Sequence, residues 1–319
     1  MDFGAAARAA EAQRRWRYRG DRLRDWEHQF GRWASPPGAT EEQRIANAEK
    51  GTKDALAASS ALKGRDIRVF TVGSYRNNTN VRQDSDVDIA VVCFDVFFPE
   101  YPEGTTQETF GNSDGHYAYA AFKDEVGQAL VARFGSPAVT RGNKAFDVHE
   151  NTYRVDADVA TFFEHRRYQR SGRYESGVEL KPDDGRPPKV INWPEQHYAN
   201  GVSKNNISGR RYKAVVRILK CLCNEMAEAG RSVADATPGF LIECLVWNVS
   251  NDHFGHSTLT SDVRECLAFL FNNTRTDAEC SEWGEVSELK YLFRPAQKWT
   301  RAQAHAFVSA AWDYIGFEG

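Results

Sequence analysis

The spacing of hydrophobic residues predicts helices in the first half of the chain. Apolar side chains recur every three or four residues over 5–34 and again over 119–134, which is typical of amphipathic helices. The proline- and glycine-containing segment 35–40 separates the first of them from another predicted helix. This helix starts at Thr40, whose hydroxyl suits a helix N-cap and is followed by two glutamates, and it runs to about Leu62.

The period of the pattern then changes along the chain. Runs of β-branched and aromatic residues predict strands over 68–72, 87–93, 138–141, 145–149 and 154–163. The proline-rich segment 182–194 is interpreted as a linker or long loop. After it, helical spacing returns and predicts helices over 209–228, 239–249, 261–272 and 300–315.

These elements predict an α+β fold in two parts. Residues 1–190 are expected to form a mixed sheet with flanking helices, the N-terminal helices included, and residues 191–319 a helical bundle. A length of 319 residues suits two domains of roughly 150 residues each. Hydrophobic residues make up 41% of the chain, an ordinary value for a globular protein.

Composition and charge exclude several classes of protein. No apolar run approaches the roughly 18 residues of a membrane span, and the N-terminus lacks the apolar segment of a secretory signal. The net charge of −3 argues against a protein that coats nucleic acid regardless of sequence. The six cysteines form no C-x-x-C pair, so we expect reduced, buried thiols in a cytoplasmic protein that does not contact membranes.

The clearest chemical signal is a glycine–serine pair followed by two aspartates. Gly73 and Ser74 open a turn after the predicted strand 68–72, and Asp86 and Asp88 lie at the start of the next strand. Residues two apart in a strand point to the same side, so the two carboxylates share a face. Carboxylate oxygens together with substrate phosphates are the usual ligands of Mg²⁺. Gly73 allows a ligand close to the backbone, where N–H groups and the Ser74 hydroxyl suit a phosphate.

A third acid is expected from a later strand. Asp158 precedes the apolar run 159–163, as Asp88 precedes its own apolar run, and a second cation would need such an additional carboxylate. Asp156 lies on the same face and is the alternative choice. A D-x-D pair taken alone more often marks a solvated sheet edge, and the preceding glycine–serine pair is what favours a phosphate and metal site.

The segment GSYRNNTNVRQDSDVDIAVV (73–92) resembles the signature of the polymerase-β-like nucleotidyltransferase superfamily. Within it, the chain is most similar to the bacterial cGAS/DncV-like nucleotidyltransferases (CD-NTases). The segments that support this narrower resemblance are ADVATFF at 157–163, the helix-like stretch 205–226 and TPGFLIE at 237–243. The resemblance covers roughly residues 40–315 and implies a polymerase-β-like core followed by a helical domain that closes the nucleotide cleft.

The chain departs from the family pattern at two places. Gly239 stands where relatives often carry a serine, so a hydroxyl contact to phosphate is missing there. Ala160 and Thr161 stand where relatives commonly have a proline after the third acid.

The resemblance implies a role for each part of the motif. Two Mg²⁺ ions, with Mn²⁺ as an alternative, would be bound by Asp86, Asp88 and Asp158, which are also the expected catalytic residues. Asp158 would in addition assist deprotonation of the attacking ribose hydroxyl. The expected nucleotide-binding residues are Gly73 and Ser74 at the terminal phosphates, Lys220 at the triphosphate and Phe240 at the donor base, together with Arg217 on the helical face of Lys220 and Gly239 beside Phe240.

Several of the basic and aromatic candidates also have a purely structural interpretation. Lys213, Arg217 and Lys220 have the spacing of a solvated helix face, and Phe240 suits a hydrophobic core equally well. The arginines of the segment 166–173 have the composition of a solvated run. Arg76 and Arg82, in the loop before the D-x-D pair, are further candidates for nucleotide contact.

The resemblance implies an enzyme that joins nucleoside triphosphates and closes them into a cyclic di- or trinucleotide, with release of pyrophosphate. Such products are second messengers in CBASS-type anti-phage defence and activate a separate effector. The alternatives are a template-independent transferase that makes RNA or linear oligonucleotides, and a non-catalytic nucleotide or nucleic-acid sensor. We further expect a monomer, and conjugation of the terminal Gly319 by a ubiquitin-ligase-like partner.

Overall fold

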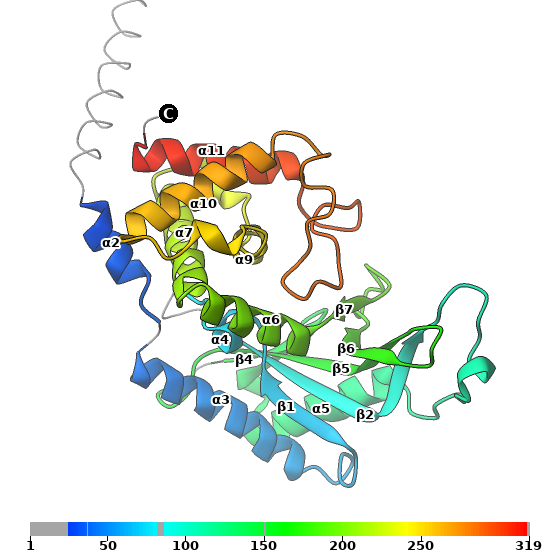
Figure 1. The fold of residues 1–319 in the computed structure, drawn as a ribbon. Helices are drawn as coiled ribbons and strands as arrows, with labels where there is room; N and C mark the ends of the chain where they lie inside the picture. The colour runs from blue at the N-terminus through cyan, green and yellow to red at the C-terminus, as the bar shows by residue number, and fades with distance from the viewer. Residues whose placement is uncertain (1–24, 37, 82–85, 150, 318–319) are drawn as a thin grey trace, which may run out of the picture. The chain divides into compact units, whose positions relative to one another are not determined.

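The computed structural model describes residues 25–36, 38–81, 86–149 and 151–317 (Figure 1). It divides into two compact units: a sheet unit of residues 37–198, and a helical unit of residues 1–36 together with 199–319. The expected helix before residue 25, as well as Arg82 and Gly319, lies outside the described residues.

The sheet unit contains one mixed seven-stranded sheet. Its strands are β1 (Ile67–Thr71), β2 (Val87–Glu100), β3 (Val139–Arg141), β4 (Ala145–Val148), β5 (Ala157–Tyr168), β6 (Tyr174–Leu180) and β7 (Val190–Asn192). The order is β1-β2-β5-β4-β3, and β6 pairs with β5 and β7. β2 and β5 run parallel, whereas all other pairs are antiparallel. This mixed sheet with flanking helices confirms the predicted fold class.

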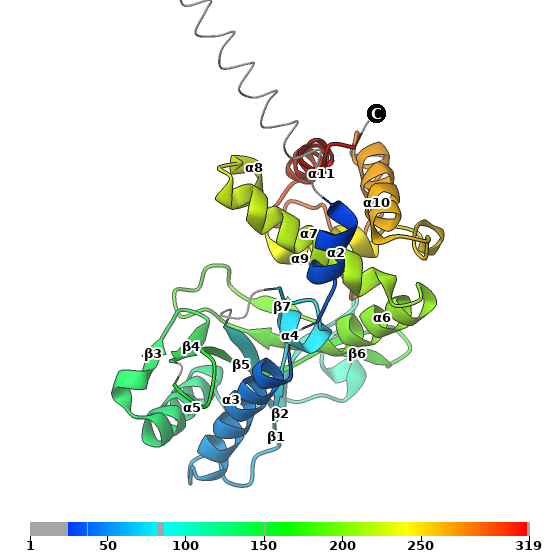
Figure 2. The same ribbon diagram turned by 90° about the vertical axis from the view of Figure 1, so that its left-hand side faces the viewer.

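Helices α3 and α5 cover one face of the sheet, as Figure 2 shows. The helical and 3₁₀ elements of this unit are α3 (Ala39–Ala57), α4 (Gly73–Asn77), η1 (Glu108–Phe110), α5 (Tyr119–Phe134) and η2 (Ser136–Ala138), and α6 (Pro194–Ile207) begins in it. Phe122 of α5 stacks on Phe163 of β5 with 5.5 Å between ring centres. Asp88 is exposed between the buried Val87 and Ile89, and successive side chains of a strand point to opposite faces, so Asp88 points away from the face that these two neighbours occupy.

The helical unit is built around the buried helix α7. Its elements are α2 (Trp26–Trp33), α7 (Arg211–Glu228), α8 (Ser232–Asp235), α9 (Gly239–Trp247), η3 (Asn251–His253), α10 (Leu259–Asn273) and α11 (Arg301–Ile315). Apolar residues of all these α-helices, including Ala234 of the short α8, meet in one core. None of the described helices is long and apolar enough to cross a membrane.

The division of the chain differs from the expected one at both ends of the sheet unit. The boundary falls after residue 198 instead of 190, within α6. The described N-terminal residues belong with the helical unit, because Trp26 and Phe30 of α2 are buried in its core. Sequence order alone puts the N-terminal residues next to the sheet-containing part, but it does not reveal which core an amphipathic helix joins.

Several element boundaries also differ from the prediction. α3 begins after Gly38, not at Thr40, and ends at Ala57. β2 continues to Glu100 through an irregularity in its pairing between Cys93 and Phe97. The expected linker contains the short strand β7, which extends the sheet beside β6.

Candidate active site

Three aspartates lie side by side across three adjacent strands of the sheet unit. Asp88 of β2 is the register partner of Asp158 of β5, and Asp147 of β4 is the partner of Asp158 on its other side. Their neighbours Ile89, Val159 and the residues flanking Asp147 are buried towards α5. The three carboxyl groups therefore share the face of the sheet that the helices α3 and α5 do not cover.

Burial and mutual repulsion raise the pKa values of the carboxyl groups on this face. Burial, followed by the charge of Asp86, raises the pKa of Asp88 to about 6. Burial, a hydrogen bond with the Asp147 side chain and the surrounding carboxylates raise the pKa of Asp158 to about 7. Burial and the charges of Asp156 and Asp147 also raise the pKa of Asp86. Each of these carboxyl groups thus ionises at a higher pH than an ordinary aspartate, and a nearby positive charge would favour its ionised form.

The chemistry of these groups fits a divalent cation. Oxygen donors from neighbouring strands, whose charges repel one another, are the donor set that Mg²⁺ accepts. In the described part of the chain, no three His, Cys, Asp or Glu side chains are already arranged closely enough to hold a metal ion. The site therefore fits a divalent cation for two reasons. Strand register brings the carboxyl groups together, and a bound cation would relieve the repulsion between them.

Gly73 is packed against this row of acids. Its φ of +66° lies in the left-handed region, and a Cβ atom at this position would collide with Oδ2 of Asp88. The backbone N–H of Val72 also donates to the carbonyl of Asp88 at 2.8 Å. Helix α4 starts directly at Gly73, so Ser74 lies in its first turn beside the acidic residues. Glycine is thus required here by close approach as well as by conformation.

The predicted nucleotide-binding residues of α7 are buried and paired. Lys220 donates to Oε2 of Glu243 at 3.0 Å, and both side chains are buried. Nε of Arg217 donates to the carbonyl of Ala34 at 2.8 Å, and burial lowers the pKa of Arg217 to about 10. Lys213 is buried as well, so the alternative of a solvated helix face is wrong for these residues.

Gly239 and Phe240 begin α9 in the same unit as Lys220. A Cβ atom at Gly239 would lie 3.5 Å from Cε of Lys220, in ordinary contact, so the space here does not demand glycine. Phe240 is 38% exposed, and its ring centre lies 5.8 Å from that of Trp299. Phe240 is therefore neither a core residue nor fully open to solvent.

The arginines after the third acid belong to the β5–β6 hairpin. Arg166 pairs with Glu164 and lies over the Phe97 ring at 3.9 Å, and Arg167 pairs with Glu100 at 3.0 Å. These contacts within the sheet give Arg166 and Arg167 a structural role that requires no substrate.

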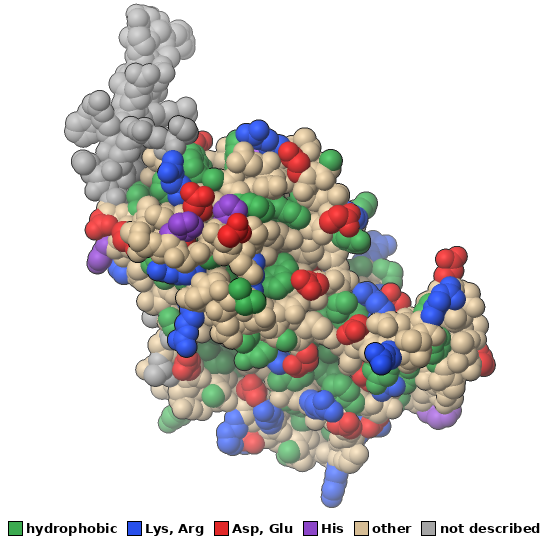
Figure 3. Space-filling view, viewed as in Figure 1, with side chains coloured by type: hydrophobic (Ala, Val, Ile, Leu, Met, Phe, Trp, Pro, Cys, Tyr) green, Lys and Arg blue, Asp and Glu red, His purple; other side chains and the backbone are tan. Residues whose placement is uncertain are grey.

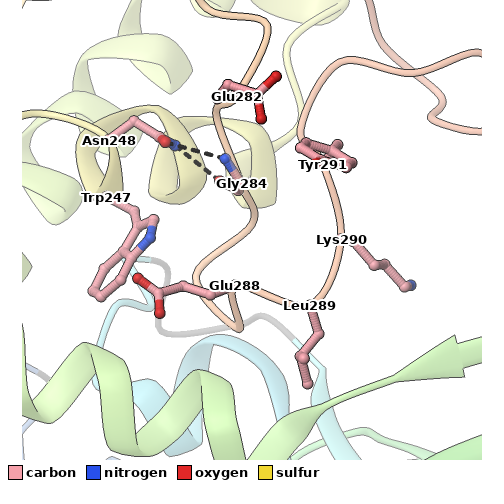
Figure 4. Close-up of a pocket in the computed structure, with 8 residues that line it drawn as sticks. All are labelled: Trp247, Asn248, Glu282, Gly284, Glu288, Leu289, Lys290 and Tyr291. Carbon is pink, nitrogen blue, oxygen red and sulfur yellow. Dashed lines mark hydrogen bonds between the residues drawn. The ribbon is translucent and has the colours of Figure 1, made fainter. Parts of the chain in front are cut away.

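The helical unit also has a pocket of about 430 Å³ (Figure 4). It is lined by Trp247, Asn248, Glu282, Gly284, Glu288, Leu289, Lys290 and Tyr291. Asn248 bridges both backbone groups of Gly284, with its Nδ2 donating to the carbonyl and its Oδ1 accepting from the N–H. None of the residues predicted from the sequence lines this pocket.

Asp147 is the residue that sequence reasoning missed. It alternates with the buried Phe146 and Val148 on a strand that the sequence does predict. That alternation places Asp147 on the solvent-facing side, but only the pairing of β4 with β5 brings it to Asp158.

Comparisons with known proteins identify the family of the chain. The family model of the cGAS/DncV-like nucleotidyltransferase C-terminal helical domain matches residues 199–316, and that of a nucleotidyltransferase domain matches residues 55–133. Two relatives named cyclic dipyrimidine nucleotide synthase CdnE, from Cecembia lonarensis and Legionella pneumophila, are 40% and 41% identical to the chain. Each of these alignments covers 91% of this chain and 98% of the relative.

A solved structure is similar over nearly the same length. The CdnE cyclic dinucleotide synthase of Elizabethkingia meningoseptica, with GTP and Apcpp, matches with a TM-score of 0.75 at 32% identity. The match covers 91% of this chain and 99% of that one. From the site, the fold and these relatives together, the chain belongs to the cGAS/DncV-like nucleotidyltransferases.

Proposed function

We propose that this chain is a nucleotidyltransferase that joins two nucleoside triphosphates into a cyclic dinucleotide, with pyrimidine nucleotides as its favoured substrates. The observation that carries the proposal is the row of Asp88, Asp158 and Asp147 beside the close-packed Gly73. The relatives at 40% and 41% identity are both named for dipyrimidine products, which supports the choice of base. A cyclic trinucleotide would need the same chemistry and is the second candidate product.

Phosphoryl transfer depends mainly on positioning and on neutralising charge. Asp86, Asp88 and Asp158 would hold two Mg²⁺ ions, which when bound neutralise the phosphates and the attacking oxygen. Gly73 and Ser74 would hold the terminal phosphates of the donor. Lys220 would have to leave its buried partner Glu243 in order to reach the triphosphate. A ribose hydroxyl then attacks the donor α-phosphate in line, assisted by Asp158. An O–P bond forms to the α-phosphate, and the bond to the departing pyrophosphate breaks.

Closure of the ring repeats the same step within the linear intermediate. The remaining ribose hydroxyl attacks the second α-phosphate, and a second pyrophosphate leaves. A product with no terminal phosphate results, which distinguishes it from a linear oligonucleotide.

The biological role proposed is anti-phage signalling in the cytoplasm. The cyclic product would act as a second messenger on a separate effector, as the family resemblance implies. All six cysteines are reduced thiols in the structure and five of them are buried, which favours a reducing compartment. We further propose that the enzyme acts as a monomer and that Gly319 is conjugated by a ubiquitin-ligase-like partner.

The experiment that tests the activity uses each α-³²P-labelled nucleoside triphosphate, singly and in pairs, with Mg²⁺ or Mn²⁺. Products are treated with phosphatase and identified by mass spectrometry. We expect phosphatase-resistant label with UTP or CTP, at the mass of a cyclic dinucleotide. Label that phosphatase releases would instead indicate a linear product, and no product from any mixture in either metal would contradict the proposal.

Matched variants tie the product to the acids of the site. Asp88→Asn and Asp158→Asn are expected to abolish product formation. Asp114→Asn removes the same charge from an exposed loop of the sheet unit and should retain activity. Equal product from Asp88→Asn and Asp114→Asn would separate the activity from this site.

A further inference from the structure

Arg76, two residues after Ser74, has partners that the proposed catalytic chemistry does not use. Its Nη2 donates to Oε2 of Glu195 at 2.7 Å. Its guanidinium carbon lies 4.9 Å from the ring centre of Phe70 and 5.0 Å from that of Tyr198. Glu195 and Tyr198 are three residues apart on α6, so they present the same helix face to the guanidinium.

These contacts differ from those of a phosphate-binding arginine. The side chain of Arg76 is only 18% exposed, and its charge is already opposed by a carboxylate. Triphosphate binding would have to displace Glu195, whose negative charge repels phosphate. The side chain of Glu195 is 64% exposed, so solvent screens the ion pair. Cation–π contacts with the rings of Phe70 and Tyr198 stabilise the position of Arg76 further.

Helix α4 needs such contacts because it is too short to be stable alone. It spans five residues, Gly73–Asn77, and ends in the left-handed conformation at Asn78. From one side, α3 holds the segment: the Tyr75 hydroxyl donates to Oε1 of Glu41 at 3.1 Å, and Nδ2 of Asn80 contacts the same oxygen at 3.3 Å. From the side of α6, the ion pair of Arg76 with Glu195 holds the same segment.

We propose that Arg76 is a positioning residue that fastens α4 to the start of α6 through Glu195 and Tyr198, and so holds Gly73 and Ser74 in place for the phosphates of the donor. The proposal rests on the phosphate-binding role proposed above for Gly73 and Ser74. The sequence suggested Arg76 as a candidate for nucleotide contact. In this proposal Arg76 does not touch the nucleotide.

Glu195→Gln separates the two roles of Arg76, because they predict opposite signs. If Arg76 acts through Glu195, loss of the carboxylate loosens α4 and weakens nucleotide binding. If Arg76 binds phosphate directly, loss of the competing carboxylate leaves binding unchanged or tightens it.

The first readout is the affinity for non-hydrolysable UTP and CTP analogues, together with KM and kcat. We expect the dissociation constant and KM to rise about fivefold in Glu195→Gln, the size of a screened ion pair, with kcat nearly unchanged. Arg76→Ala should lose about tenfold or more, because the contacts with both rings disappear too. Glu195→Asp, which keeps the carboxylate, should restore part of the affinity. Glu103→Gln, an exposed acid elsewhere in the sheet unit, is the matched control.

The second readout is hydrogen exchange of the amides of 74–79 without nucleotide. We expect faster exchange in Glu195→Gln and Arg76→Ala than in the wild type and Glu103→Gln. This measurement stands even if the wild type makes no product, so it distinguishes failure of the positioning role from failure of the proposed function. Unchanged exchange in both variants, or unchanged or tighter analogue binding in Glu195→Gln, would overturn the proposal.

Discussion

At the scale of single residues, the raised pKa values of Asp88 and Asp158 set the pH range of the proposed site. Both groups ionise less readily than an ordinary aspartate, because the pKa of Asp88 is raised to about 6 and that of Asp158 to about 7. A cation binds the ionised form, so protons compete with it as the pH falls through these values. The rate should therefore fall on the acid side of neutrality.

This competition makes a specific prediction for the metal dependence. Raising the Mg²⁺ concentration should move the acid limb of the rate profile to lower pH, because more cation displaces the protons from the same carboxylates. Initial rates measured from about pH 5 to 9 at a low and a high Mg²⁺ concentration test this. An acid limb at the same pH under both conditions would assign the titration to other groups.

Gly73→Ala is a second prediction at this scale. The added methyl group would collide with the Asp88 carboxylate, and the left-handed φ disfavours alanine by about 1 kcal/mol or more. We expect loss of product formation and weaker Mn²⁺ binding, measured by titration of the metal. Gly64→Ala is the control, since its φ is also positive but nothing lies within 4 Å of the added atom. Equal activity in the two variants would show that close approach at Gly73 is unimportant.

At the scale of elements, α2 is held to the helical unit by its aromatic face. Phe30 is fully buried, and its ring centre lies 5.3 Å from that of Trp26 and 6.1 Å from that of Trp33. Arg217 of α7 donates to the carbonyl of Ala34 directly after the helix. An N-terminal segment thus completes a core made mostly by the C-terminal part of the chain.

Phe30→Ala is therefore expected to destabilise the helical unit by about 3–5 kcal/mol, the usual cost of deleting a buried phenylalanine ring. Chemical denaturation followed by the fluorescence of tryptophan measures it. Arg32→Ala, at an exposed position of the same helix, should change the free energy of unfolding by less than about 0.5 kcal/mol. Similar values for both variants would mean that α2 does not belong to that core.

The elements with a sustained apolar period were predictable from the sequence. α5 has the bounds expected of it, and α7 and α11 differ by only one or two residues at their starts. β6 was not predicted, because Glu175 and Ser176 near its start are polar and it contains Gly177. That glycine is explained only by a distant residue: a Cβ atom there would lie 2.6 Å from the Trp193 ring. Contacts of this kind leave no periodic signal.

The candidate site was predictable to the same extent. Alternation within a strand placed Asp86 and Asp88 on one face, and the apolar run after Asp158 marked it as the equivalent residue of another strand. Asp147 was missed because strand pairing, a non-local property, brings it to Asp158. The buried pairing of Lys220 with Glu243 also depends on how α7 packs against α9.

At the scale of the whole molecule, the distribution of charge favours small nucleotides over a long polyanion. The net charge is −3, and Lys and Arg side chains alternate with Asp and Glu on the face seen in Figure 3. Binding of RNA without regard to sequence requires a continuous basic surface that neutralises many phosphates. The face in view has no such surface.

We therefore expect no binding of labelled tRNA or double-stranded RNA in gel shifts at physiological salt, under conditions where the triphosphate analogues bind. A shift that weakens steeply with salt would favour the alternative of a transferase that extends RNA. Phosphatase-sensitive products of increasing length would support the same alternative.

The parallel pairing of β2 with β5 has a consequence for when an enzyme of this kind becomes competent. Asp88 and Asp158 are neighbours in the sheet, yet α5, β3 and β4 lie between them in the chain. A ribosome must therefore deliver β5 before the two acids can meet. Copies of the chain that end before β5 lack Asp158 and therefore cannot assemble this row of acids.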